Sequence, residues 1–307
     1  MKQPYAHARK QSASSRIVSP DGRFNVTRVG LFNPPWRDVY HVMLTMPWPI
    51  FFLTVGIFYL SANMLFASAY LVGSDNIANA TPNAFLDAFF FSVQTMASIG
   101  YGAMYPQTVY ANFVVTIEAL SGLMILAAAT GLMFARFSKP TARVLFSNSA
   151  VITLHNGIPT LIFRTANQRR NRMLEAQVQL TLVHNTMTQE GQFMRRFTNL
   201  PLVRSHSPIF ALSWTVMHVI DDHSPLINQS VHDLLEQDAE LIVTLTGIDE
   251  TLAQTIHSRH SYMPTELAWN YQFVDLFTHL PNGNLAIDYA QFHKIYPVYT
   301  DTFAVEG

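Results

Sequence analysis

The segment from Thr95 to Gly102, with the sequence TMASIGYG, combines the aliphatic hydroxyls of Thr95 and Ser98 with two glycines that stand two positions apart. Carbonyl and hydroxyl oxygens are neutral ligands, so they can replace the hydration shell of a cation without trapping the ion as a carboxylate would. Gly100 and Gly102 give the backbone the freedom to point successive carbonyls at one axis, because only glycine adopts positive φ at little cost. The chemistry available to this segment is therefore cation coordination by main-chain oxygens.

Two apolar stretches flank this segment. Residues 46–72 contain no charged side chain, and residues 110–134 contain only Glu118. At about 1.5 Å of rise per residue, each stretch is long enough to cross the hydrocarbon core of a bilayer, which is about 30 Å thick. We therefore expect two membrane-spanning helices, over residues 47–72 and 109–136.

A third apolar stretch between the two spans predicts a short helix over residues 83–96, with Thr81 as its N-cap and Pro82 in its first turn. This helix is too short to cross a bilayer. Non-helical backbone at membrane depth is tolerated only where it is buried in protein or lines a watery cavity. A short helix that ends in the glycine-containing residues 98–102 thus predicts a re-entrant loop, with the negative end of the helix dipole facing a cavity.

The same segment resembles the selectivity filter of potassium channels, whose usual form is TxxTVGYG. The resemblance implies that K⁺ binds the carbonyls of Ser98, Ile99, Gly100 and Tyr101 and the Ser98 hydroxyl, and that four copies of the chain complete the ring. The Tyr101 side chain would point away from the pore and brace the filter. Ser98 replaces the usual threonine and lacks its methyl group and stiff χ1, so a weakly selective monovalent cation channel is the alternative.

The distribution of basic residues predicts the orientation in the membrane. Seven lysines and arginines precede the first apolar stretch, whereas residues 73–109 contain none. Because basic residues accumulate in cytoplasmic loops, we expect both termini to be cytoplasmic. Residues 1–33 would form a polar N-terminal cytoplasmic segment.

Residues 34–46 are expected to form an amphipathic helix that lies in the membrane interface just before the first span. Pro34 and Pro35 would open this helix. Its apolar face would hold Trp36, Val39, Tyr40, Met43 and Leu44, and its polar face Arg37, Asp38, His41 and Thr45. The alternative is a helix packed on the surface of the soluble domain.

From residue 137 to residue 307 the pattern predicts a separate, all-β domain. Residues 177–182 alternate between polar and apolar side chains, which is typical of a half-buried strand. Asn156-Gly157 and Pro281-Asn282-Gly283 each lie between two apolar runs and predict hairpins, the second joining residues 273–280 to residues 285–289. Many short strands with few helical runs favour a β-sandwich.

Three further stretches resemble the inward rectifier potassium channels, above all the prokaryotic KirBac group: FARFSKP from Phe134, HSPIF from His206 and SWTVMHVID from Ser213. The likeness runs from about Arg28 to Ile295. It implies an immunoglobulin-like cytoplasmic sandwich, a homotetramer and passive K⁺ conduction, with no enzymatic activity and no cofactor. It also suggests a bacterial inner membrane.

The resemblance assigns roles to four residues of the second span. Phe134 matches a bulky gate residue at the inner end of the pore, although it could instead pack between helices. Leu126 matches a cavity position that is polar or acidic in strongly rectifying relatives, so block by polyamines should be weak. Gly122 and Gly131 match proposed hinges, and close helix packing is the equal alternative.

Arg136, Lys139 and Arg143 lie just inside the membrane, where a basic cluster can bind anionic lipid headgroups such as phosphoinositides. Ordinary positive-inside anchoring explains the same three residues.

Glu118 is a functional candidate because a carboxylate within a span is costly to bury. We expect it to brace the filter from behind. The ion pair that relatives often place around the filter is absent, since Gln94 and Ala103 stand near its positions.

Composition excludes several other classes of function. The net charge of −1 gives no basic surface for nucleic acid, and the lack of cysteine excludes thiolate sites. None of the 12 histidines makes a metal set, the best-spaced pairs being His218 with His223 and His257 with His260. A membrane-anchored β-sandwich acting as receptor or scaffold remains as the alternative of another class, and it predicts no ion flux.

Overall fold

The computed structural model of the chain describes residues 16–19, 22, 25, 30, 38–73, 75–82 and 84–298. Most of the predicted N-terminal segment, and Pro34 to Arg37 of the predicted interfacial helix, lie outside the described residues. The chain divides into two compact units. One runs from Gly30 to Lys139, and the other comprises Pro140–Gly307 together with Met1–Val29.

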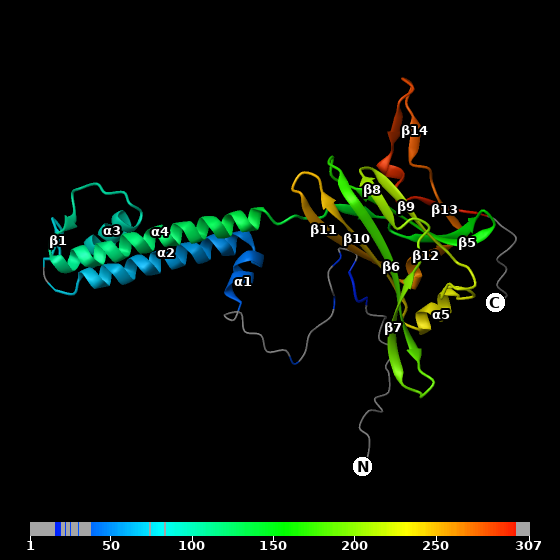
Figure 1. The fold of residues 1–307 in the computed structure, drawn as a ribbon, viewed down its shortest axis with the longest axis horizontal. Helices are drawn as coiled ribbons and strands as arrows, with labels where there is room; N and C mark the ends of the chain where they lie inside the picture. Colours follow the sequence, from blue (N-terminus) through cyan, green and yellow to red (C-terminus); the bar gives the residue numbers. More distant parts are fainter. Residues whose placement is uncertain are drawn as a thin grey trace, which may run out of the picture. The chain divides into compact units, whose positions relative to one another are not determined.

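The helical unit contains two long apolar helices, α2 (Trp48–Tyr70) and α4 (Val109–Phe137). These are the helices among the described residues that are long and apolar enough to cross a membrane. Figure 1 shows them side by side, with the shorter helix α3 (Phe85–Met96) near the ends that the loop joins. Most of their large apolar side chains are exposed in the single chain, as expected of helices that meet lipid or other subunits.

The two short helices begin later than predicted. Helix α1 runs from Val39 to Thr45, and Asp38 is its N-cap, accepting a hydrogen bond from the backbone N–H of His41 at 3.2 Å, rather than a member of its polar face. Helix α3 begins at Phe85, and its N-cap is Ala84 instead of Thr81. The prediction of Thr81 as cap was wrong, because the helix begins one turn later and leaves Thr81 outside it, with its backbone N–H donating to the carboxylate of Asp87 in the first turn at 2.8 Å.

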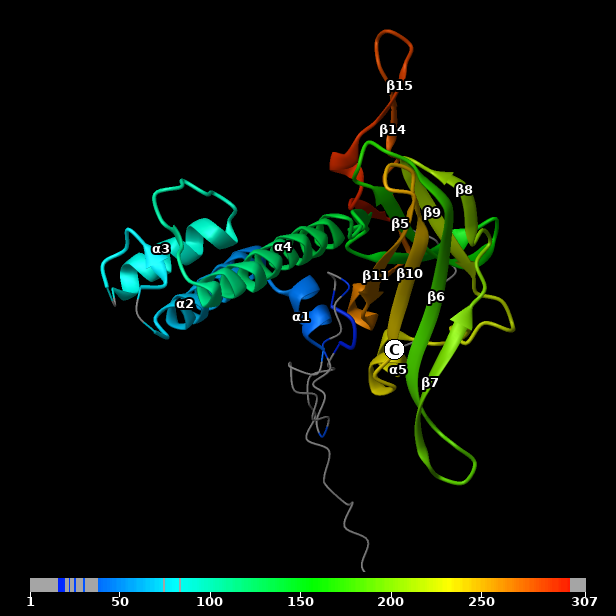
Figure 2. The ribbon, with the colours of Figure 1, turned by 60° about the vertical axis from the view of Figure 1, so that its left-hand side comes forward.

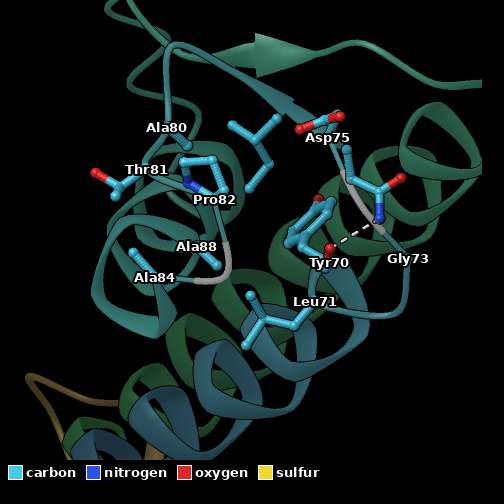
Figure 3. A pocket seen from close by; sticks show the side chains of 11 residues that line it. Tyr70, Leu71, Gly73, Asp75, Ala80, Thr81, Pro82, Ala84 and Ala88 are labelled. Atoms are coloured by element: carbon cyan, nitrogen blue, oxygen red, sulfur yellow. Dashed lines mark hydrogen bonds between the residues drawn. The ribbon is translucent and has the colours of Figure 1, made fainter.

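Two features hold the ends of the loop that carries α3 together: a small two-stranded sheet and the hydrogen bonds of the Asn76 side chain. Strand β1 (Ile77–Ala78) pairs with β2 (Tyr105–Pro106). The amide of Asn76 donates to the carbonyls of Tyr70 and Val72 at 2.9 and 3.0 Å, and its oxygen accepts from the Thr108 hydroxyl at 2.7 Å. The end of α2 is thereby tied to the N-cap of α4. Figure 3 shows the bond to Tyr70 beside a small cavity of about 50 Å³ between α2 and the start of α3.

The second unit contains two five-stranded sheets, one in the order β11-β10-β6-β7 with β8 beside β6, the other in the order β12-β4-β5-β3 with β9 beside β5. The larger strands are β4 (Ala150–His155), β5 (Ile158–Asn167), β6 (Met173–Met187), β7 (Phe193–Leu200), β8 (His206–Phe210), β9 (Ser213–Val219), β10 (Glu240–Asp249) and β11 (Gln254–Tyr262). The short elements are β3 (Val144–Phe146), α5 (Val231–Glu236), η2 (Pro264–Glu266), β12 (Leu267–Trp269), β13 (Tyr271–Phe273), β14 (Phe277–His279), β15 (Leu285–Ile287), η3 (Tyr289–Gln291) and β16 (Ile295–Pro297).

A single buried core joins the inner faces of these sheets, with Leu161 and Phe163 from one and Leu180 and Val243 from the other. The predicted all-β sandwich is therefore confirmed, and its sheets can be followed in Figure 2. The hairpin at Asn156-Gly157 is also confirmed, since His155 pairs with Ile158. Both turn residues have positive φ, 54° and 81°, which a two-residue hairpin of this kind requires.

The second predicted hairpin is shorter than expected. The apolar run at residues 273–280 is not one strand, because β13 ends at Phe273 and β14 begins at Phe277. Between them Asp275 accepts a bond from the Phe277 N–H at 3.0 Å, and Leu276 packs into a small core with Ala166 and Phe292. This local turn interrupts the strand.

Candidate functional site

The backbone of residues 98–102 alternates in the sign of φ. Ser98, Gly100 and Gly102 have φ of 55°, 59° and 79°, whereas Ile99 and Tyr101 are not among the residues with positive φ. A backbone whose φ alternates in sign does not continue the helix, and it can direct successive carbonyls toward one side. This is the geometry that a row of carbonyl ligands needs.

Ser98 was not predicted to adopt this conformation. A non-glycine residue in the left-handed region costs about 1–2 kcal/mol, and such strain is concentrated at functional sites. The glycines predicted positive φ at positions 100 and 102. Only the two-residue spacing between them could have predicted positive φ at position 98 as well. The end of α3 fixes the strained residue, because the N–H groups of Ser98 and Ile99 donate to the carbonyls of Thr95 and Gln94 at 3.0 and 2.8 Å.

Glu118 of α4 is fully buried, in a network that joins α2, α3 and α4. The Tyr70 hydroxyl of α2 donates to its carboxylate at 2.5 Å, and the Ser92 hydroxyl of α3 contacts the other carboxylate oxygen. The Ser92 oxygen also lies 3.0 Å from the side-chain oxygen of Asn63. The expected bracing residue thus contacts α3 through Ser92 and α2 through Tyr70, and Asn63 joins the network through Ser92. Sequence reasoning missed these three polar partners. Of these partners, Asn63 could have been found from the sequence, because an amide side chain within an apolar span is a functional candidate.

Gly122 is the point where α4 touches the end of α3. A Cβ placed on Gly122 would lie 2.4 Å from the Met96 carbonyl oxygen, whereas a Cβ on Gly131 would meet no atom within 4 Å. Close helix packing therefore accounts for Gly122, and the hinge role of both glycines stays a prediction. Leu126 follows Gly122 by one helical turn and is 66% exposed in the single chain.

Comparison with known proteins agrees with this arrangement. Residues 144–306 match the family model for the C-terminal domain of inward rectifier potassium channels, and residues 49–139 match the ion channel model. The chain is 50% identical to the inward rectifier potassium channel Kirbac3.1 of Paramagnetospirillum magnetotacticum, over 91% of this chain and 95% of the relative. The chain belongs to the inward rectifier potassium channels. It is an integral membrane protein and a potassium channel rather than an enzyme, and the predicted likeness to the prokaryotic group is confirmed.

Animal inward rectifiers are more distant and longer. The irk-1 channel of Caenorhabditis elegans is 31% identical over 96% of this chain, and the G protein-activated inward rectifier potassium channel 1 of Bos taurus is 31% identical over 95%. The chain spans 59% and 63% of the lengths of these two relatives.

The C-terminal end of the inward rectifier's α4 is tied to the helix before the first span. The guanidinium of Arg136 donates to the Met43 carbonyl and, at 2.6 Å, to the Met46 carbonyl. It also lies over the rings of Trp48 and Phe51, with its carbon 4.4 and 4.6 Å from their centres. Arg136 is only 9% exposed, so most of the surface with which it was expected to meet a lipid headgroup is occupied by the chain itself.

The two other lipid candidates of this inward rectifier are exposed. The Lys139 ammonium donates to the Leu44 carbonyl at 3.2 Å and retains two further donors, and Arg143 is exposed in the β-rich unit. Phe134, the predicted gate, is 73% exposed in the single chain.

The histidines that the structure describes do not converge on a metal site. His218 is buried and hydrogen-bonded to the Pro201 carbonyl and the Ser224 hydroxyl, at 2.7 and 2.8 Å, and His257 lies 3.1 Å from the Thr246 hydroxyl. Among the described residues, no three histidine, cysteine, aspartate or glutamate side chains are grouped so that they could hold a metal ion.

Proposed function

We propose that four copies of this chain form a K⁺-selective pore in which the carbonyls of Ser98, Ile99, Gly100 and Tyr101, with the Ser98 hydroxyl, coordinate the permeant ion. The observation that carries this proposal is the alternating sign of φ from Ser98 to Gly102, at the end of a short helix held between two helices long enough to span a membrane. Conduction is passive and follows the electrochemical gradient.

The geometry of coordination calls for several copies of the chain, and membership of the inward rectifier family supports four. One chain contributes only an arc of carbonyls, so a closed shell of oxygen ligands around the ion needs further copies arranged about an axis. Tyr101 is 75% exposed in the single chain, which leaves its ring available to pack against a neighbouring copy and brace the filter.

The inner half of α4 supplies the rest of the pore. Leu126 places an apolar side chain in the cavity, so polyamine block there is weak. Four Phe134 side chains close the inner end by excluding water from a narrow apolar constriction. The exposure of both residues in the single chain is compatible with these positions.

Anionic lipid regulates the channel through Lys139 and Arg143, the exposed members of the basic cluster. Arg136 contributes by holding the end of α4 against the helix before the first span. Both termini face the cytoplasm of a bacterial cell, as the basic residues on either side of the spans indicate.

Ion flux into liposomes that contain the purified protein tests this function. With K⁺ as the only permeant ion we expect flux that barium blocks and that an anionic lipid alters, and with Na⁺ we expect little. Equal flux of the two ions would instead support the weakly selective channel that the missing methyl group of Ser98 allows. No flux from tetrameric protein under any lipid condition, even in a Phe134→Ala variant, would favour the receptor or scaffold.

A further inference from the structure

Glu118 is buried in a part of the chain that contains no basic side chain. Its own side chain is fully buried, and residues 42–135 contain no lysine, arginine or histidine. Arg136 lies about five helical turns further along α4. Further copies of the chain bring the same sequence, so these residues add no cation in an assembly either. An ionised carboxylate at this position would be a buried charge without a counter-charge, which is costly.

The amide of Asn63 has one favourable orientation. Its nitrogen donates to the Tyr59 carbonyl at 2.8 Å and lies 3.5 Å from the sulfur of Met96, and both of these partners act as acceptors. The reverse orientation would place the amide oxygen against the Tyr59 carbonyl oxygen. The Asn63 oxygen therefore faces Ser92, whose hydroxyl oxygen lies 3.0 Å away.

The Ser92 hydroxyl lies between two groups that accept hydrogen bonds. One is the amide oxygen of Asn63, and the other is the carboxyl group of Glu118. A hydroxyl has one hydrogen, so Ser92 donates to only one of the two. Among the described residues, Ser92 is the donor available to the Asn63 oxygen. If Ser92 donated to Glu118 instead, this buried oxygen would have no donor, which is destabilising.

A proton on Glu118 removes this conflict. The protonated carboxyl group donates to the Ser92 oxygen, Ser92 donates to the Asn63 oxygen, and Asn63 donates to the Tyr59 carbonyl. The Tyr70 hydroxyl donates to the second oxygen of the carboxyl group at 2.5 Å. Each polar atom then has a partner of the opposite kind, and no charge is buried.

We propose that Glu118 carries a proton at neutral pH and positions the filter as the first donor of a hydrogen-bond chain that runs from α4 through α3 to α2. The N–H groups of residues 98 and 99 donate to carbonyls in the last turn of α3, so the chain of bonds that fixes α3 also fixes the start of the filter. The effect on conduction rests on the proposed function of residues 98–102. Glu118 is thus a positioning residue, which acts on the ion through α3.

Infrared spectroscopy of the purified, full-length channel at neutral pH tests the protonation directly. A protonated carboxyl group has a carbonyl-stretching band that a carboxylate lacks. We expect this band in the wild type and its loss in Glu118→Gln. The matched control Asp87→Asn changes the acid of α3 and should keep the band, because Asp87 accepts from the Thr81 N–H in the first turn of that helix. A wild-type spectrum that shows no such band relative to Glu118→Gln would overturn the proposal.

Ser92→Ala keeps this test decisive if Glu118→Gln fails to fold. It removes the acceptor of the carboxyl hydrogen, so the band should shift in frequency. A band that stays at the wild-type frequency in Ser92→Ala would not belong to Glu118 and would contradict the proposal. The spectrum is independent of ion conduction, so a failed filter assignment and a failed protonation assignment can be told apart.

Reversal potentials test the positioning role. Glutamine can donate to Ser92 and accept from Tyr70 as the protonated acid does, so Glu118→Gln should keep the permeability of K⁺ relative to Na⁺ within about twofold of the wild type. Glu118→Leu has a similar volume without these bonds, and it should lower the ratio by about fivefold or more. An equal loss of selectivity in both variants would show that the filter needs a negative charge at position 118, and the proposal would be wrong.

Discussion

The guanidinium carbon of Arg136 lies 4.4 Å from the centre of the Trp48 ring, so the last turn of α4 is joined to the first turn of α2. The same guanidinium caps carbonyls at the end of α1. A displacement of the helix that precedes the first span would therefore be transmitted to the end of the pore-lining helix, two residues from Phe134.

Arg136→Gln should lower the thermal stability of the purified channel, because it removes a cation–π contact and charge-assisted bonds together worth about 2–4 kcal/mol per chain. The matched control is Arg143→Gln, which makes the same charge change at an exposed residue and should alter stability by less than about 0.5 kcal/mol. Thermal unfolding in detergent measures both. Identical behaviour of the two variants would show that Arg136 is only one more membrane-anchoring charge.

Ser92→Ala should destabilise the filter, because it leaves an oxygen of the buried Glu118 carboxyl group without its hydroxyl partner, at a cost of about 1–3 kcal/mol. The permeability of K⁺ relative to Na⁺ should fall with it. Ser121→Ala is the control, since the Ser121 hydroxyl donates only to the Ile117 carbonyl of its own helix, at 2.7 Å. A Ser92→Ala channel with wild-type selectivity would contradict the bracing role of Glu118.

Gly122→Ala should reduce assembly or flux sharply, because the added methyl group would meet the Met96 carbonyl oxygen at 2.4 Å and displace the end of α3 from the filter. Gly131→Ala adds the same methyl group to the same helix where no atom of the chain lies within 4 Å. K⁺ flux into liposomes compares the two. Equal loss in both variants would favour a shared hinge over packing at Gly122.

Phe134→Ala should raise K⁺ flux under conditions that keep the wild type closed, because it removes the apolar ring at the proposed gate. Phe113→Ala makes the same change at a similarly exposed residue in the N-terminal half of α4 and should leave flux unchanged. If the two variants conduct alike, the gate lies elsewhere.

The β-rich unit should lose stability as the pH falls below about 6.5. Burial lowers the pKa of His218, so the unfolded chain binds a proton near pH 6.5 while the folded chain does not. Below pH 6.5 the free energy of unfolding therefore falls by up to about 1.4 kcal/mol per pH unit. The decline ends when the pH reaches the pKa of His218 in the folded state. Unfolding experiments between pH 6.5 and 5.5 measure this slope. His218→Gln should flatten the slope. The control His223→Gln changes an exposed histidine and should leave the slope as in the wild type. An unchanged slope in His218→Gln would assign the effect to other groups.

Much of the fold could be predicted from the sequence because its signals are local. A charge-free stretch of membrane length, a two-residue alternation and an Asn-Gly turn each depend on neighbouring residues. The starts of α1 and α3 were misplaced because the positions where the caps form, Asp38 and Ala84, are decided by local backbone geometry that composition does not reveal. Arg136 could not be assigned its contacts, since the Met43 carbonyl lies 93 positions away along the chain.

In the candidate site, too, some features could be predicted from local sequence and others could not. The glycines at positions 100 and 102 predict positive φ, whereas Ser98 also has positive φ although serine does not predict it. The partners of Glu118 come from two other helices, and only the packed structure brings them together.

The most direct test of the filter is the reversal potential of single channels in a planar bilayer, with K⁺ on one side and Na⁺ on the other. We predict a reversal potential far from zero, in the direction set by K⁺, since carbonyls from Ser98 to Tyr101 replace the hydration shell of K⁺ in preference to that of Na⁺. A Ser98→Thr variant should be at least as selective. Reversal near zero in both proteins would contradict the assignment of residues 98–102 as a K⁺-selective filter.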